Sequence, residues 1–535
     1  MAFYFGAAFS MLSFYNVGLI LFGVVVGLIF GAIPGLSTTM AIALFLPMTF
    51  RMAVADGLAL LLGVYIGGFS GGLIAAILMN IPGTAASIAT TFDGYPMAMQ
   101  GKAGKALGLG IVSSFLGGFI SILALMFVSP VLASVAIKFG SYEYFALCLF
   151  ALTMIITMSS DNYAKGLISG LLGILISMVG GAPIDGLPRF TFGIHELDGG
   201  FNLVAVLVGL FAVSELFDLA STKNKDVNAD VHEPKMKGFG FAGKELLAEK
   251  WNILRSSVIG ILIGILPGIG GSLASLMSYN AAKKCSKHPE LFGTGINAGV
   301  VASEAANNAA IGGALIPLLS LGIPGDAVTA LLLGAFTMQG VQPGPLMFQN
   351  QGDIVSFIFI ALLIANLFMI GTEFFAIRGF VKLLKIKREI LFPAIILLCM
   401  LGAYGLNNRL FDVVVIFLFG VVGYFMKRWG LKTQPFILGY LVGPMAELYF
   451  RRGFMYSEGR VAPFFTSPIA VLFYVVAFVN IAFAIRESIS KQRKAKRTKK
   501  HISYQVRACG SLLPNGTRFV WERAGRKKTS PSLRS

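Results

Sequence analysis

A short phrase that interrupts helices occurs at matching places in the two halves of this chain. The first half has GAIPG at residues 31–35 and IPG at 81–83, each following a long apolar run. The second half has GILPG at 264–268 and IPG at 323–325. Proline removes a backbone donor, and glycine adopts conformations closed to other residues, so each phrase should break a helix. The repetition predicts an internally duplicated protein with four breaks.

The composition indicates whether those breaks lie in water or in a membrane. Hydrophobic residues make up 56% of the chain and charged residues 13%, against about 45–50% and about 25% in soluble proteins. We therefore predict an all-α polytopic membrane protein with two internal repeats, broken or re-entrant helices and about 10–12 transmembrane helices. In hydrocarbon an unpaired backbone group costs several kcal/mol, so such breaks are stable only inside protein or beside a polar cavity.

Charge and polarity divide the chain into four predicted segments. These are a first membrane repeat at 1–220, a polar cytoplasmic linker at 221–251, a second repeat with additional helices at 252–485, and a basic, disordered cytoplasmic tail at 486–535. The tail holds 15 of the 43 Lys and Arg residues but only two acidic ones. The positive-inside rule places this C-terminus in the cytoplasm, with 407–409 and 451–452 on the outer side. Basicity confined to a tail argues against a nucleic-acid partner.

Enzyme motifs are weak here. Gly68-Phe69-Ser70-Gly71-Gly72 fits the G-x-S-x-G pattern of serine hydrolases. A serine nucleophile needs a base, however, and all four histidines lie outside the apolar spans. An intramembrane serine protease is therefore disfavoured, and we predict a close-packing cluster. The chain has neither a P-loop nor an HExxH motif, and its four cysteines are scattered. We predict no catalytic residue, no cofactor and no metal beyond a transported sodium ion.

Polar residues next to the breaks are the candidates for binding, because helix N-termini attract carboxylates and freed carbonyls coordinate small cations. The predicted substrate-binding residues are Pro34, Gly35, Ser37, Thr38, Asn80, Pro82, Gly83, Thr84, Asp93, Pro267, Gly268, Asn307 and Asn308. The predicted cation-coupling residues are Glu304, Asp326, Thr329, Pro324 and Gly325. Alternatively, the hydroxyls cap the restarted helices and the asparagines crosslink neighbouring helices.

Two features of the second half stand out. Glu304, Asn307 and Asn308 are spaced i, i+3 and i+4, so they share one helix face. Asp326 follows the second IPG, where the first half has the neutral Thr84. Either Asp326 is an N-cap, or its carboxylate draws a cation while Thr84 leaves the first half open to an anion. On the second view, Asp326→Ser alters the cation dependence of transport more than substrate affinity.

Five motifs in order resemble the large membrane subunit of the tripartite tricarboxylate transporter family over about residues 15–485. They are NIPGT at 80–84 leading to DGYP at 93–96, GKAGKALG at 101–108, EAANNAA at 304–310, GIPG at 322–325 and QPGP at 342–345. Ser37 stands where the family often has glycine, and Asp326 where a small residue is expected. The tail beyond about residue 491 does not resemble the family.

The resemblance implies a multi-pass permease of the bacterial inner membrane. It implies two partners, a small membrane subunit and a periplasmic solute-binding protein, and import of citrate-like carboxylates with sodium ions or protons. Moving a trivalent anion inward against 100 mV costs roughly 7 kcal/mol, which favours ion coupling. The alternative is a carboxylate channel or uniporter that needs neither a gradient nor a binding protein. The carboxylate and the coupling ion stay open at this point.

Overall fold

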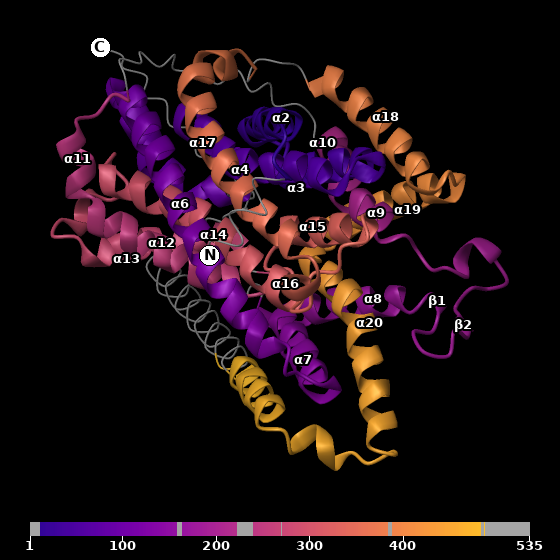
Figure 1. The fold of residues 1–535 in the computed structure, drawn as a ribbon. Coiled ribbons are helices and arrows are strands. Elements are labelled where there is room, and N and C mark those ends of the chain that lie inside the picture. The colour runs from indigo at the N-terminus through magenta and orange to yellow at the C-terminus, as the bar shows by residue number, and fades with distance from the viewer. Residues whose placement is uncertain are drawn as a thin grey trace, which may run out of the picture. The chain divides into compact units, whose positions relative to one another are not determined.

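The computed structural model describes residues 11–157, 163–221, 239–268, 270–383, 388–482 and 486. Helices make up most of this part of the chain (Figure 1). One antiparallel hairpin joins β1 (Gly180–Gly181) to β2 (Pro188–Arg189), with Gly180 opposite Arg189. The predicted all-α class is confirmed. The tail after Arg486 and linker residues 222–238 lie outside the described residues.

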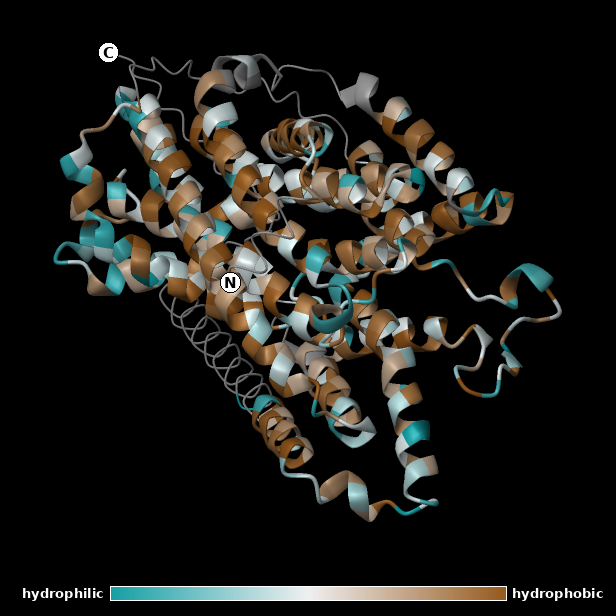
Figure 2. Cartoon of the chain, viewed as in Figure 1, coloured by the Kyte–Doolittle hydropathy of each residue, from teal (hydrophilic) through white to brown (hydrophobic). Residues whose placement is uncertain are grey.

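Hydropathy confirms a multi-pass membrane protein. Within the described residues six helices are long and apolar enough to cross a bilayer, and six shorter apolar helices accompany them. The six long ones are Phe14–Ala32, Val54–Met79, Ala85–Ala136, Leu203–Ser221, Gly352–Phe375 and Leu410–Arg428. Figure 2 shows apolar residues along most helices, and hydrophilic ones gathered at helix ends and connections.

The first repeat breaks at both of its predicted places. Its elements are α2 (Phe14–Ala32), α3 (Thr38–Phe45), η1 (Leu46–Arg51), α4 (Val54–Met79), η2 (Ala85–Ser87), α5 (Ile88–Met97), η3 (Ala98–Lys102) and α6 (Ala103–Ala136). Gly35, between α2 and α3, has a φ of 93°, and Asn80, which ends α4, has a φ of 57°. Both values are left-handed, so neither residue can continue a right-handed helix.

The second repeat follows the same order. Its elements are α12 (Lys250–Ile265), α13 (Gly270–Cys285), η6 (Pro289–Leu291), α14 (Asn297–Leu321) and α15 (Ala327–Met338). The break predicted at 264–268 forms, and it divides the apolar stretch over 252–282. Gly268 and Gly270 have φ values of 80° and 64°, so the stretch divides into α12 and α13.

The remaining helices surround the repeats. They are α7 (Ser141–Thr157), α8 (Tyr163–Ser177), η4 (His195–Leu197), α9 (Leu203–Val208), η5 (Gly209–Val213), α10 (Ser214–Ser221), α11 (Gly243–Ala248), α16 (Met347–Asn350), α17 (Gly352–Leu383), α18 (Arg388–Asn407), α19 (Leu410–Arg428), α20 (Thr433–Tyr456) and η7 (Ala462–Phe465). α17 packs against α2, α4 and α6, and α20 against α7 and α8.

Glycine contacts hold each repeat together in the same way. α2 packs on α4, and a Cβ added to Gly27 of α2 would lie 2.4 Å from the Val64 carbonyl oxygen. α12 packs on α14, and a Cβ on Gly264 would lie 2.6 Å from the Ala310 carbonyl oxygen. Small residues permit this backbone approach, which drives helix association where apolar burial alone gives little in lipid.

The breaks of the two repeats meet reciprocally. α3, which follows the first break, contacts α15, which follows the last. α13, which follows the third break, contacts η2 and α5, which follow the second. The Gly268 N–H also donates to the Gly325 carbonyl at 2.7 Å, which joins the two breaks of the second repeat directly.

Two positions predicted to lie outside contact the same segment. Arg451 of α20 bonds Asp185 at 3.0 Å, beside the β1–β2 hairpin. Arg409 donates to the Glu196 carbonyl at 3.3 Å, further along that connection. Both arginines therefore contact the connection between α8 and α9.

Candidate functional site

A short segment of α4, residues 65–72, contacts residues at three of the four breaks and Asn307 of α14. α4 is enclosed by protein, because its apolar stretch is 100% buried. Tyr65 donates to Asp326 of the last break at 2.9 Å, and the Phe69 carbonyl accepts from Asn307 at 3.1 Å. A Cβ on Gly68 would clash with Thr38 of the first break, and one on Gly72 with Thr84 of the second. The GFSGG motif at 68–72 is thus the close-packing cluster predicted from the sequence.

Glu304 lies at the centre of this region, fully buried in α14. Its carboxyl group accepts hydrogen bonds from the Thr90 hydroxyl of α5 and, at 3.0 Å, from the Ser114 hydroxyl of α6. Thr90 also lies 3.0 Å from the Ser303 hydroxyl. Hydroxyl donors stabilise a carboxylate, which accepts only. The predicted cation-coupling glutamate therefore joins three helices of both repeats.

The paired asparagines lie on the same face of α14, as their spacing indicates. Asn307 donates to α4, whereas Asn308 donates to the Glu304 carbonyl at 3.3 Å. Neither side-chain oxygen has a hydrogen-bond partner among the described residues. Gly271, in the first turn of α13, approaches Asn307 so closely that a Cβ there would lie 2.9 Å from its Oδ1. Burying an amide oxygen without a hydrogen-bond partner costs free energy. The side-chain oxygens of Asn307 and Asn308 can therefore accept from a bound donor or coordinate a cation.

Asp326 is the N-cap of α15. Its Oδ1 accepts from the Thr329 N–H at 2.7 Å and from the Thr329 hydroxyl at 2.8 Å, while its Oδ2 accepts from Tyr65. The capping alternative is thus the one that the geometry shows, because both carboxyl oxygens already have protein donors. Asp326 and Thr329 as cation-coupling residues remain a prediction.

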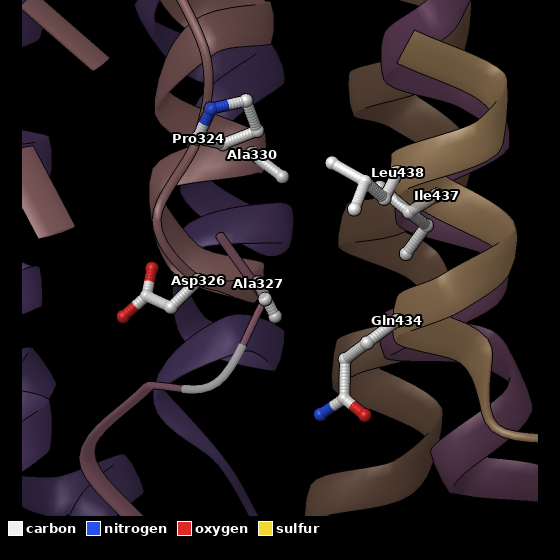
Figure 3. Close-up of a pocket in the computed structure, with 8 residues that line it drawn as sticks. Pro324, Asp326, Ala327, Ala330, Gln434, Ile437 and Leu438 are labelled. Carbon is white, nitrogen blue, oxygen red and sulfur yellow. The ribbon is translucent and has the colours of Figure 1, made fainter. Parts of the chain in front are cut away.

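A small cavity of about 20 Å³ lies beside this cap (Figure 3). It is lined by Gly268, Pro324, Asp326, Ala327, Ala330, Gln434, Ile437 and Leu438. Figure 3 shows the Asp326 carboxyl turned away from the α20 residues that form the opposite wall. The volume holds a single water-sized particle, so it is too small for a tricarboxylate in this conformation.

Asp93 of α5 forms a clamp with the second repeat. Its Oδ1 accepts from the N–H groups of Gly293, Gly295 and Ile296 at 2.9, 2.8 and 3.1 Å, and its Oδ2 accepts from the Tyr279 hydroxyl at 2.9 Å. These donors lie in and around the connection that leads into α14. The structure therefore places this predicted substrate-binding residue among backbone groups of the second repeat.

The polar residues of the first repeat cap their own helices. Ser37 accepts from the Met40 N–H at 3.2 Å and lies 2.8 Å from the Thr39 hydroxyl. Thr84 and Ser87 exchange bonds in a capping box at the start of η2. Of the remaining predicted substrate-binding residues here, Pro34, Thr38 and Gly83 are buried, Gly35 and Pro82 are half-buried, and Asn80 is exposed. Pro267 of the second repeat is also buried.

A basic opening of about 590 Å³ adjoins the small cavity. It is lined by Lys165, Lys427, Gly430, Leu431, Lys432, Thr433 and Gln434. Gln434 lines both spaces, and Lys427 is ion-paired with Glu215 at 2.5 Å. By the predicted topology this opening faces the cytoplasm. Its lysines attract anions.

Sequence reasoning missed several residues of this site. Tyr65, Thr90 and Ser114 are ordinary in an apolar run, and only the fold shows that they contact the two acids. Glu373 of α17 is different. It is an acidic residue inside an apolar stretch of the sequence, residues 354–377, and such residues are functional by default. In the structure it is fully buried.

The fold and this site define a polytopic membrane protein whose broken helices from two repeats meet around buried polar residues, the arrangement of secondary transporters. Residues 17–438 match the model of the tripartite tricarboxylate transporter TctA family. The chain belongs to this family, a family of transporter subunits, as its motifs indicate.

Two proteins of Agrobacterium vitis are similar to this chain. One, a 52.8 kDa protein in the TAR-I ttuC' 3' region, is 38% identical over 88% of this chain and 93% of its own length. The other, from the TAR-II ttuC' 3' region, is 40% identical over 44% of this chain and 97% of its own length. No solved structure matches the chain.

Proposed function

We propose that this protein is the permease subunit of an ion-coupled importer, which takes up citrate-like carboxylates delivered by a periplasmic solute-binding protein. A small membrane subunit completes the assembly in the bacterial inner membrane. Sodium ions or protons drive the uptake. Family membership supports the substrate class and the partners.

The observation that carries this proposal is the position of the first turn of α13 beside Asn307 of α14. The first turn of α13 contains Gly270 and Gly271, which leave its N–H groups uncovered by side chains of their own. It faces Asn307, whose buried Oδ1 has no partner among the described residues. A helix start presents partial positive charge to a carboxylate, and the amide oxygen can accept from a hydroxyl or a cation bound with it.

The small cavity and the basic opening offer such an anion an exit route. Gln434 lines both the small cavity beside Asp326 and the basic opening. Three lysines line that opening. Rearrangement of the helices around Gln434 would widen the narrow part and release the substrate toward positive charge.

The test is uptake of labelled citrate into vesicles that contain the full chain and its small membrane subunit, with and without the binding protein. We expect uptake to require the binding protein together with a sodium or proton gradient. Asn307→Ala should raise the KM for citrate about tenfold, since a lost polar contact of this kind costs about 1–2 kcal/mol. Asn350→Ala, in the short α16, is the matched control. Uptake without a gradient and without a binding protein would show a channel or uniporter instead.

A further inference from the structure

Glu373 of α17 is a second fully buried acid beside the site, and the proposed function gives it no role. Neither of its carboxyl oxygens has a hydrogen-bond partner in the described part of the chain. The Ser70 hydroxyl faces this carboxyl group without reaching hydrogen-bond geometry. Glu304 lies near enough to interact with it electrostatically. Two buried acids thus share one region of the protein.

The surroundings of the two acids are unequal. Glu304 has two hydroxyl donors, from Thr90 and Ser114, which suit an ionised carboxylate. Glu373 has none among the described residues. Burying an ionised carboxylate without a partner costs several kcal/mol, and a second negative charge beside Glu304 adds to that cost. A protonated Glu373 avoids both penalties.

Few other groups act on Glu373. Helices α2, α4, α6 and the short α16 pack against α17, and of their described residues the Ser70 hydroxyl is the polar group that faces the carboxyl. Glu304, on α14, is the one charged group among the described residues that acts on it. Whether Glu373 carries a proton therefore depends on Glu304 and on access to water.

We propose that Glu373 is a proton-binding site, which takes up and releases one proton in each transport cycle under the influence of Glu304. This inference rests on the proposed function, and it names the coupling ion as a proton. Glu304 belongs to the second repeat, whereas α17 follows it in the chain and packs on the first. Movement of one repeat against the other changes the separation of the two carboxyl groups. An increased separation, or the entry of water, alters the proton affinity of Glu373 and so links proton transfer to the movement.

The first experiment compares Glu373→Gln, which imitates the protonated acid, with the wild type in vesicles holding the small subunit and the binding protein. A pH gradient of one unit supports about tenfold accumulation per coupled proton. The variant should lose this factor while it still exchanges labelled for unlabelled citrate. Glu373→Asp should restore part of the accumulation, and the exposed Glu290→Gln should behave as wild type. Accumulation by Glu373→Gln equal to wild type, or by wild type with sodium alone, overturns the inference.

The second experiment needs no transport and so separates the two proposals. Infrared spectra of the purified wild type at neutral pH should show the C=O band of a protonated carboxyl group. That band should be absent from Glu373→Gln and present in Glu290→Gln, and size-exclusion chromatography should show all three folded. An unchanged band in Glu373→Gln refutes a proton on Glu373. Loss of the band together with no uptake by wild type would instead reject the proposed function alone.

Discussion

The Asp93 clamp offers the sharpest test of how the two repeats are joined. Asp93 receives four hydrogen bonds, three of them from backbone N–H groups of the connection before α14. Hydrogen bonds to a charged group contribute about 1.5–3 kcal/mol each, and neutral ones about 1 kcal/mol. Asp93→Asn keeps an acceptor for the three N–H groups but removes the charge. We therefore expect it to lower the free energy of local opening by about 3 kcal/mol.

Hydrogen exchange measured by mass spectrometry checks this value directly. A loss of about 3 kcal/mol should accelerate exchange of the amides of Gly293, Gly295 and Ile296 roughly a hundredfold. Asp198→Asn is the control, since Asp198 is an exposed acid whose described side-chain partner is His195 at 3.3 Å. Unchanged exchange in Asp93→Asn, combined with a raised KM for citrate, would refute the clamp and favour direct substrate contact by Asp93.

Three further perturbations test the packing, the capping and the linker. Gly27→Leu should prevent α2 from packing on α4 and abolish the folded protein on size exclusion, whereas Gly18→Leu, which meets nothing within 4 Å, should be tolerated. Asp326→Ser keeps a capping residue but leaves the buried Tyr65 hydroxyl without its acceptor, so the free energy of unfolding should fall by about 1–3 kcal/mol. An unchanged melting temperature would contradict this. The cation dependence of uptake is measured alongside. The hydrogen bond from Lys105 lowers the pKa of Glu245 below its ordinary value of 4.5, so this contact stabilises α11 above that pH and is lost as the pH falls through the lowered pKa; limited proteolysis at α11 between pH 7 and pH 3 should show the onset, and Glu245→Gln should abolish this pH dependence.

Much of the architecture follows from local sequence. The four breaks form where Pro and Gly dictate, because those residues fix or free the backbone whatever surrounds them. The capping of α15 by Asp326 is likewise local, since cap and donor are three residues apart. The face shared by Glu304 and the two asparagines follows from helical periodicity alone.

Other features depend on contacts between distant segments. Asp93 follows a break in the sequence, which suggested a substrate residue, yet its donors lie 186 to 203 positions away. Spacing along the chain does not predict such partners.

The sequence by itself determined that this is a helical, internally duplicated membrane protein, and it determined the family. This is possible because composition and the backbone chemistry of Pro and Gly act locally. Only the tertiary structure decided which breaks face each other, α3 with α15 and α13 with η2 and α5. It also decided that Glu304 has donors while Glu373 has none among the described residues. The physical reason is that burial and hydrogen bonding depend on what packs against a side chain, and in this protein those neighbours come from the other repeat.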